Sequence, residues 1–242
     1  MTIEERDRIA HRSGGSAAAG PVVAIMQPYF IPYAGYFRLL AAADTFVIYD
    51  SVQFPREGYV HRNRLPDANG DLRWIRMPLA KAGLHTPIDQ LAFLPDARER
   101  LIAQFAAFPQ LRDRSSDPAG LIDALLDTTQ RPSLYIEELL RRAATALGLP
   151  WRVERLSAMD LPPHLTGEDR VIAVARALGA RTYVNSPGGR SLYDARRFAE
   201  AGMDLRFLPD HRGASASILS RLLGEPADTV AAEIHHNTQL LP

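Results

Sequence analysis

The sequence predicts an α/β fold in which a mostly parallel sheet is flanked by helices. Short apolar, β-branched runs at residues 22–26 and 45–49 enclose a helical pattern. A strand, a helix and a strand within about 30 residues form a βαβ unit, whose two strands pair in parallel. The same alternation returns near the end of the chain. Of the 242 residues, 46% are hydrophobic and 23% are charged, as in ordinary globular chains.

The first unit is bounded by prolines. Pro21 and Pro28 enclose the first strand, and Pro28 and Pro32 prevent a regular helix from starting directly after it. The apolar spacing predicts a short helix from Tyr36 to about Asp44. A strand over residues 45–49 then ends next to Asp50.

The middle of the chain is predicted to contain two further strands and then a series of helices. Residues 74–78 and 88–93 are predicted as further strands, in an order that the sequence does not reveal. Helices are predicted over residues 97–108, 118–129 and 133–147, the second with Asp117 as its N-cap and the third closed by Gly148. A helical subdomain near residues 95–147, inserted into the α/β unit, stays an alternative.

The last third resumes the alternation. Its predicted elements, in order, are a strand at 151–156, a helix from Thr166 to Gly179, strands at 182–184 and 203–208 around a helix at 191–201, and helices at 215–223 and 228–236. The whole pattern predicts a Rossmann-like sheet with a helical insertion. We expect one domain over residues 21–242, preceded by a flexible tail over residues 1–20.

Composition excludes several classes of function. Lys and Arg number 28 and Asp and Glu number 28, so bulk charge does not favour nucleic acid as a partner. The chain has no cysteine, which excludes thiol nucleophiles and fits a reducing cytoplasm. No run reaches the roughly 20 apolar residues of a membrane span. We expect a cytoplasmic protein without membrane insertion.

The segment 27–36 is the first candidate site, because it follows a strand at the sheet edge where open parallel sheets bind ligands. Gln27, Tyr33 and Tyr36 are predicted to shape a substrate pocket. Gly35 allows close approach of a ligand to the backbone near the first free amides of a helix. The alternative is an aromatic loop that packs on the core.

Two further clusters follow along the chain. Asp50 and Gln53 lie after the second strand and are predicted to orient an acceptor, although Asp50-Ser51 is also a common turn or cap pair. His61, with a pKa near neutrality in its free form, is a candidate general base. Arg62, Asn63 and Arg64 are predicted to hold an anionic donor, with both guanidiniums on one face if the segment is extended. A basic surface loop is the alternative.

The last cluster begins at Asn185, a predicted substrate-binding residue, and continues into Gly188 and Gly189, which free the backbone to wrap an anion. A plain Gly-Gly turn is the alternative, since neither common phosphate-loop motif is present. Lys81 is another predicted substrate-binding residue. No metal ligand set is predicted, and His235-His236 points to a helix end.

Several strings together resemble the WbqC-like protein family. They are Met-Gln-Pro-Tyr-Phe-Ile-Pro-Tyr-Ala-Gly-Tyr-Phe at 26–37, Asp-Thr-Phe-Val-Ile-Tyr-Asp-Ser-Val-Gln-Phe at 44–54, Asn-Arg at 63–64, Pro-Leu-Ala-Lys at 78–81, His-Thr-Pro-Ile at 85–88, Gly-Ala-Arg-Thr-Tyr at 179–183 and Ser-Ile-Leu-Ser-Arg-Leu-Leu at 217–223. The resemblance implies a role in surface-polysaccharide or secondary-metabolite biosynthesis.

We therefore expect a transferase or ligase that moves an activated acyl, aminoacyl or nucleotidyl group to an amine or hydroxyl of a polar metabolite or nucleotide sugar. Asp50, His61 and Arg64 are its predicted catalytic residues, and ATP or another nucleotide with Mg²⁺ is the candidate cofactor. The alternative is a noncatalytic protein that presents a sugar nucleotide or a carrier-bound intermediate to a partner pathway enzyme.

Overall fold

A computed structural model describes residues 20–117 and 119–238. Its main sheet has five strands, all parallel: β1 (Val22–Met26), β2 (Thr45–Ile48), β5 (Val153–Arg155), β6 (Thr182–Asn185) and β7 (Asp204–Phe207). The spatial order is β5-β2-β1-β6-β7. Counted along the chain, this is 3-2-1-4-5, the order of a Rossmann-like sheet. The predicted α/β class is confirmed.

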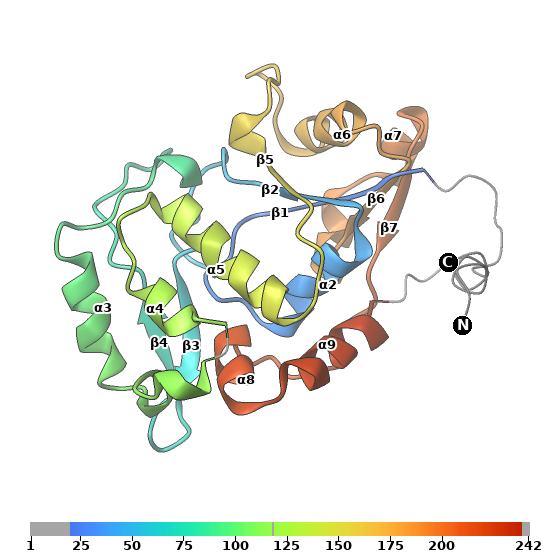
Figure 1. Cartoon of the computed structure of the whole chain (residues 1–242). Helices are drawn as coiled ribbons and strands as arrows, with labels where there is room; N and C mark the ends of the chain where they lie inside the picture. Colours follow the sequence, from blue (N-terminus) through green and yellow to red (C-terminus); the bar gives the residue numbers. More distant parts are fainter. Residues whose placement is uncertain (1–19, 118, 239–242) are drawn as a thin grey trace, which may run out of the picture.

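Helices cover both faces of this sheet (Figure 1). One layer holds α6 (Gly167–Ala177) and α7 (Ala195–Glu200), and the other holds α2 (Ala34–Ala42), α5 (Pro132–Ala146), α8 (Ile218–Gly224) and α9 (Ala227–His236). Alternation along β1 explains the two layers, since Val23 and Ile25 enter the core under α6 and α7 while Ala24 faces α2. A strand buried on both faces must be apolar throughout, as this one is.

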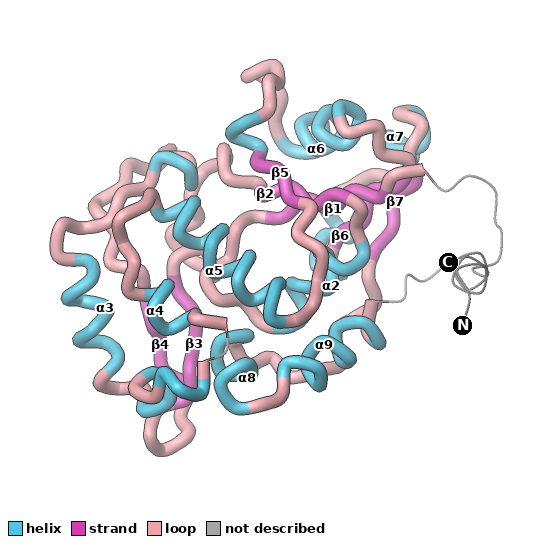
Figure 2. Tube along the Cα trace, in the orientation of Figure 1, coloured by secondary structure: helices cyan, strands magenta, loops and turns pink. Residues whose placement is uncertain are grey.

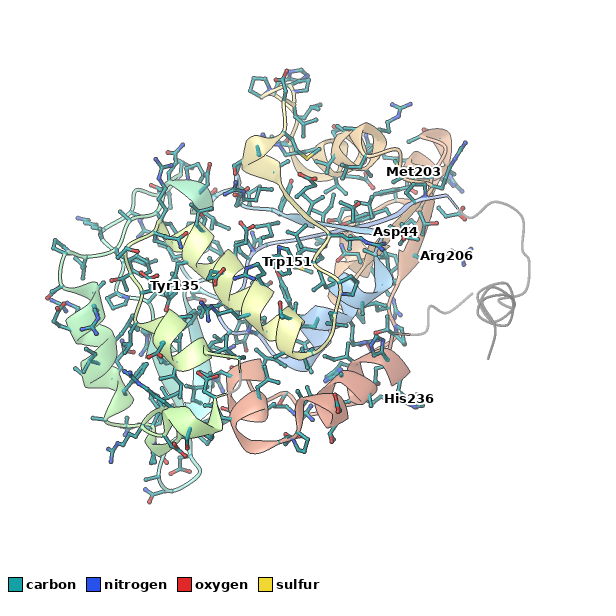
Figure 3. All side chains as sticks on the ribbon, viewed as in Figure 1. Asp44, Tyr135, Trp151, Met203, Arg206 and His236 are labelled. Atoms are coloured by element: carbon teal, nitrogen blue, oxygen red, sulfur yellow. The ribbon has the colours of Figure 1, made fainter. Side chains whose placement is uncertain are left out.

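A long connection between β2 and β5 holds, among its described residues, an antiparallel hairpin and the α-helices α3, α4 and α5 (Figure 2). The elements are β3 (Arg62–Pro66), β4 (Leu72–Arg76), α3 (Ala97–Phe105), α4 (Leu121–Leu125) and α5. Their apolar side chains join the core of the α2 layer. Tyr135 of α5 (labelled in Figure 3) stacks on Phe30 with ring centroids 6.2 Å apart and donates a hydrogen bond to the Leu125 carbonyl at 2.9 Å.

Several predicted elements differ from the structure. Residues 88–93 form no strand: a 3-10 turn covers Ile88–Gln90, and Phe93 pairs with Leu79 in an isolated bridge. The strand β3 was not predicted, because its solvent face carries Arg62 and Arg64 rather than β-formers.

Several helices are shorter than predicted, and two of them differ most. The helix expected over 118–129 is limited to Leu121–Leu125, and Pro118, its expected first turn, lies outside the described residues. The helix expected from Ser191 begins at Ala195 instead, because the Asp194 carboxylate accepts a hydrogen bond from the Arg196 amide and caps it there. The predicted tail at 1–20 lies outside the described residues, except for Gly20. None of the described helices has the length and apolarity to cross a membrane.

Candidate functional site

A pocket of about 630 Å³ lies at the carboxyl ends of three strands, a volume suited to a small molecule. Its wall includes Met26 at the end of β1, Ser186 after β6 and Leu208 after β7. Strand order reverses between β1 and β6. The strands β2 and β5 lie on one side of β1, and the later strands β6 and β7 lie on the other side. Open α/β sheets bind ligands in the crevice at such a reversal.

The loop between β1 and α2 has an unusual backbone. Ile31 has φ of 40°, and it is the single described residue other than glycine with positive φ. A β-branched residue rarely adopts this conformation, which costs on the order of 1–3 kcal/mol. Its carbonyl accepts hydrogen bonds from Asn63 Nδ2 and from Ser217 Oγ, both at 2.7 Å. Asn63 Nδ2 also donates to the Phe30 carbonyl at 3.1 Å. Two distant segments therefore fix the loop in its strained shape.

This loop and its neighbour bring four tyrosines to the pocket: Tyr29, Tyr33, Tyr36 and Tyr59. The Tyr29 ring lies 5.6 Å from that of Tyr36 and 6.1 Å from that of Tyr59. Burial raises the pKa of Tyr29, Tyr33 and Tyr36, so all three keep their phenolic protons. Aromatic faces with polar tips are typical of sites for planar rings and sugars.

Gly35 is needed for the position of Tyr33. A Cβ atom on Gly35 would lie 2.1 Å from Tyr33 Cε2, so any larger residue would displace the Tyr33 ring. The ring thus covers the first turn of α2, where the sequence suggested that a ligand would approach the backbone.

Arg38 contributes a buried positive charge to the pocket wall, with 1% of its surface exposed. Its Nη2 donates to the carbonyl oxygens of Pro209 (2.8 Å) and Asn237, while its Nε is buried without a partner among the described residues. Burial lowers the pKa of Arg38, and Tyr33 and Asp210 act against this shift. A guanidinium stays charged in proteins, so this cation favours an anionic group in the pocket.

His211 also lines the pocket, with its ring edge-on to Tyr33 at a centroid distance of 5.2 Å. Its Nε2 lies 3.2 Å from the Ala214 carbonyl and 3.6 Å from Glu233 Oε1. Because both neighbours are acceptors, the neutral form of His211 is expected to have its proton on Nε2 and a lone pair on Nδ1. Nδ1 is buried and has no partner among the described residues.

A partly buried ion pair between Arg221 and Glu233 lies next to His211. Arg221, with 5% of its surface exposed, donates to Glu233 Oε2 at 2.7 Å and to both carboxylate oxygens of Glu225. Gly213 is required by the same arrangement, since a Cβ atom there would lie 1.8 Å from Glu233 Oε1. Glu233 is thus held between Arg221 and His211.

Four of the predicted site residues line this pocket: Tyr33, Gly35, Tyr36 and Asn63. The Asn63 side chain, however, is engaged in holding the loop backbone. Gln27 contributes its carbonyl, which accepts a hydrogen bond from the Tyr36 hydroxyl at 3.1 Å. The structure thus brings together the segment 27–36 and part of the segment 61–64.

Asp50 and Gln53 lie apart from the residues that line the pocket. The Asp50 carboxylate is buried and accepts hydrogen bonds from Ser157 N (2.9 Å) and Ser157 Oγ (2.6 Å), so it joins the end of β2 to the turn after β5. Gln53 is exposed and donates to the Leu84 carbonyl at 2.9 Å. Both contacts are long-range rather than a local turn or cap. The roles predicted for Asp50 and Gln53 in orienting an acceptor, and a catalytic role for Asp50, stay predictions.

The basic residues also lie outside the pocket lining. His61 is half-buried against the Phe54 ring, with ring centroids 5.1 Å apart. Burial is the main cause that lowers the pKa of His61, and the positive charges of Arg62 and Arg76 lower it further. Arg62 and Arg64 share one face of the hairpin, as their alternation predicted, and both lie over the Trp74 ring. Lys81 is exposed on the loop that follows β4.

Asn185 stabilises the turn after β6 rather than lining the pocket itself. Its side chain donates to the Tyr183 hydroxyl at 3.1 Å and accepts from the Ser186 amide at 2.7 Å. The residues that follow, Ser186 to Gly188, line the pocket. Asn185 therefore positions one wall of the pocket through the backbone.

Arg38, Asp210 and His211 were not predicted from the sequence. Asp210 and His211 come shortly after the predicted strand 203–208, so the rule that selected Asp50 and Asn185 applies to them as well. Arg38 lies among Phe37, Leu39 and Leu40 in the sequence. A single arginine in an otherwise apolar helix could have indicated a functional residue. Among residues 20–117 and 119–238, no three His, Asp or Glu side chains are grouped to hold a metal ion.

Comparison with known proteins gives a family match. The model of the WbqC-like protein family matches residues 27–213, a range that includes every pocket-lining residue except Met26 and Ser215. The uncharacterized protein Rv1507c of Mycobacterium tuberculosis is 30% identical over 184 residues, which cover 74% of this chain and 78% of that protein. No solved structure matches the chain.

Asn63→Ala tests the support of the strained loop. The substitution removes the hydrogen bonds to the Phe30 and Ile31 carbonyls, and we expect the free energy of unfolding to fall by about 1–3 kcal/mol. Urea unfolding measures the change. Asn69→Ala in the exposed turn of the hairpin is the matched control. Equal stability of the two variants would contradict a supporting role for Asn63.

A double-mutant cycle tests the contact between Asp50 and Ser157. Asp50→Ala removes both hydrogen bonds, whereas Ser157→Ala removes only the one from Ser157 Oγ, because the Ser157 amide remains. The bond from Oγ is lost in each single variant, so we expect the double variant to lose less stability than the sum of the two, by about 0.5–3 kcal/mol. Chemical denaturation of the four proteins gives the coupling energy. Strict additivity would show that the hydrogen bond from Ser157 Oγ does not contribute to stability.

His61 predicts a pH dependence of stability. Because its pKa is lowered in the folded protein, the unfolded chain binds a proton first as the pH falls below about 6.5, and stability decreases in that range. We expect His61→Gln to lose less stability than the unmodified protein between pH 7.5 and pH 5.5. Unfolding curves at both pH values provide the comparison, and parallel losses in the two proteins would refute the shift.

Proposed function

Because this chain belongs to the WbqC-like protein family and has a pocket at the reversal of its parallel sheet, we propose that it is a biosynthetic group-transfer enzyme. Its substrate in this proposal is a small polar metabolite or nucleotide sugar. The transferred group is an activated acyl, aminoacyl or nucleotidyl group, and the acceptor is an amine or a hydroxyl.

One observation carries the proposal: the pocket wall combines aromatic faces, a buried cation and a histidine with a free lone pair. Tyr29 and Tyr59 offer rings for a planar or sugar moiety, and Arg38 offers charge for a carboxylate or phosphate. Buried polar atoms normally have hydrogen-bond partners, yet Arg38 Nε and His211 Nδ1 have none among the described residues. A bound polar ligand supplies what both atoms lack.

The chemistry follows from the position of the proton on His211. The acceptor nitrogen or oxygen attacks the activated carbonyl carbon or phosphorus, His211 Nδ1 takes the acceptor's proton, and the leaving group departs with the electron pair of the broken bond. Glu233 stabilises the imidazolium that forms, because its carboxylate lies beside Nε2. In this proposal His211 takes the role of base that the sequence suggested for His61, since His211 lines the pocket.

A nucleotide would use the same features. Its phosphates are the anionic group that Arg38 favours, and Asp210 is the one carboxylate among the pocket-lining residues described. Any Mg²⁺ would therefore be held chiefly by the phosphates of the nucleotide.

His211→Asn provides the test of this mechanism. The purified protein is incubated with ATP, sugar nucleotides, amino acids and amines, and mass spectrometry follows the consumption of each compound. For the substrate pair found, we expect the variant to lose 10²- to 10⁴-fold in turnover, the usual contribution of a general base, with little change in binding.

His235→Asn is the matched control, because His235 is exposed on α9. Turnover by His211→Asn at the rate of this control would refute His211 as the base. Retention of ligands in the pocket with no consumption of any donor would favour a noncatalytic presenting protein instead.

A further inference from the structure

The β3–β4 hairpin gathers three guanidinium groups around one indole ring. The Cζ atoms of Arg62, Arg64 and Arg76 lie 4.5, 4.6 and 5.7 Å from the centroid of the Trp74 ring. Register explains this, because Arg64 pairs directly with Trp74 and Arg62 with Arg76 across the two strands. We call these four residues the arginine platform.

The opposite face of the hairpin anchors the platform. Leu65 and Ile75 are fully buried in the core, so the alternate residues face outward. Gln104 of α3 holds the outer edge of β4, since its side chain accepts from the Arg76 amide at 2.8 Å and donates to the Arg76 carbonyl at 2.9 Å. The arginines therefore project from a fixed backbone.

The platform has positive charge without compensation nearby. Among the described residues no carboxylate lies within 4.0 Å of Arg62, Arg64 or Arg76; the one side-chain hydrogen bond is from Arg62 Nε to the Gly58 carbonyl at 3.2 Å. Exposed cation–π contacts contribute only about 0.5–1 kcal/mol each. Three like charges around one ring repel one another, and an anion would relieve that repulsion.

Aromatic rings connect the platform with the pocket. Trp74 lies 6.3 Å from Tyr59, and Tyr59, which lines the pocket, lies 6.1 Å from Tyr29. The platform therefore stands beside the pocket on the Tyr59 side. A ligand longer than the pocket can reach both.

We propose that the arginine platform binds the diphosphate group of the substrate or product, while the remainder lies in the pocket. Guanidinium forks pair with phosphate oxygens, and outward residues two apart on a strand are about 6.6 Å from each other, a spacing that lets neighbouring arginines share one diphosphate. A nucleic acid fits less well, because the chain as a whole has no net charge. This inference rests on the proposed function for the identity of the bound molecule.

Tryptophan fluorescence tests the platform without any need for turnover. The chain has two tryptophans, Trp74 and Trp151, and Trp151 lies before β5 (labelled in Figure 3), so Trp151→Phe leaves Trp74 as the reporter. In this background, titration with inorganic pyrophosphate at about 100 mM salt is expected to change the Trp74 emission. Adding Arg64→Gln should weaken pyrophosphate binding at least tenfold.

Arg73→Gln is the matched control, because it removes the same charge from the same hairpin but from the opposite face of β4. Equal pyrophosphate affinity in the Arg64 and Arg73 variants, or no emission change at millimolar pyrophosphate, would overturn the proposal. Tight binding of single-stranded RNA that pyrophosphate does not displace would also overturn it.

UDP, ADP and UDP-glucose distinguish the sources of the diphosphate. If one nucleotide binds more tightly than pyrophosphate, and Tyr33→Ala removes this additional affinity, the diphosphate belongs to a nucleotide that enters the pocket. Equal affinity assigns it to free diphosphate as a product. Because pyrophosphate binding and turnover are measured separately, loss of the first in Arg64→Gln is independent of loss of the second in His211→Asn.

Discussion

The site depends on one carbonyl oxygen. Ile31 O accepts hydrogen bonds from Asn63 and Ser217, which belong to segments 32 and 186 residues away along the chain. These bonds hold a β-branched residue at φ of 40°, a conformation that an isolated peptide would leave. With Ile31 held, Phe30 and Ile31 enter the core while Tyr29 and Tyr33 turn to the pocket. Polar side chains of two distant segments thus orient one aromatic loop.

Several polar residues near the pocket stabilise the backbone rather than offer free groups to a ligand. Asn63 lines the pocket, yet its side chain is occupied by the loop backbone; Asn185 acts in the same way on the turn after β6. Asp50 joins two strand ends. Polar residues that follow parallel strands can therefore either support the backbone or contact a ligand, and their position along the chain does not show which of the two they do. Hydrogen bonds help to separate the two roles: the side chains of Asn63, Asn185 and Asp50 are paired within the protein. Arg38 Nε and His211 Nδ1, by contrast, are buried atoms of pocket-lining residues and have no partner among the described residues.

The sequence was sufficient to predict the strands of the parallel sheet, but it did not reveal their order or most of the residues that line the pocket. Apolar runs such as residues 22–26 and 45–49 specify buried parallel strands, because both faces of such strands meet core. The hairpin strand Arg62–Pro66 is invisible to that pattern, since one of its faces is basic and solvent-exposed. In this strand Arg64 is exposed, Arg62 is half-buried and Asn63 is buried, so the alternation was predicted correctly even though the strand was not. His211 was missed although it follows the predicted strand 203–208; what the sequence does not show is that Glu233, from a distant helix, lies beside it.

Two separate positive sites require different explanations. Arg38 is buried in the pocket wall, where removing a guanidinium from water is costly; two backbone carbonyls offset part of this cost, and in the proposed function an anionic group of the ligand offsets more of it. The arginine platform is solvated, so each of its charges costs little and only their number and spacing give it selectivity. A molecule with one anionic group requires only the first site. A molecule that carries a second, more extended anion some distance from the first requires both, and the line of tyrosines between them matches that shape.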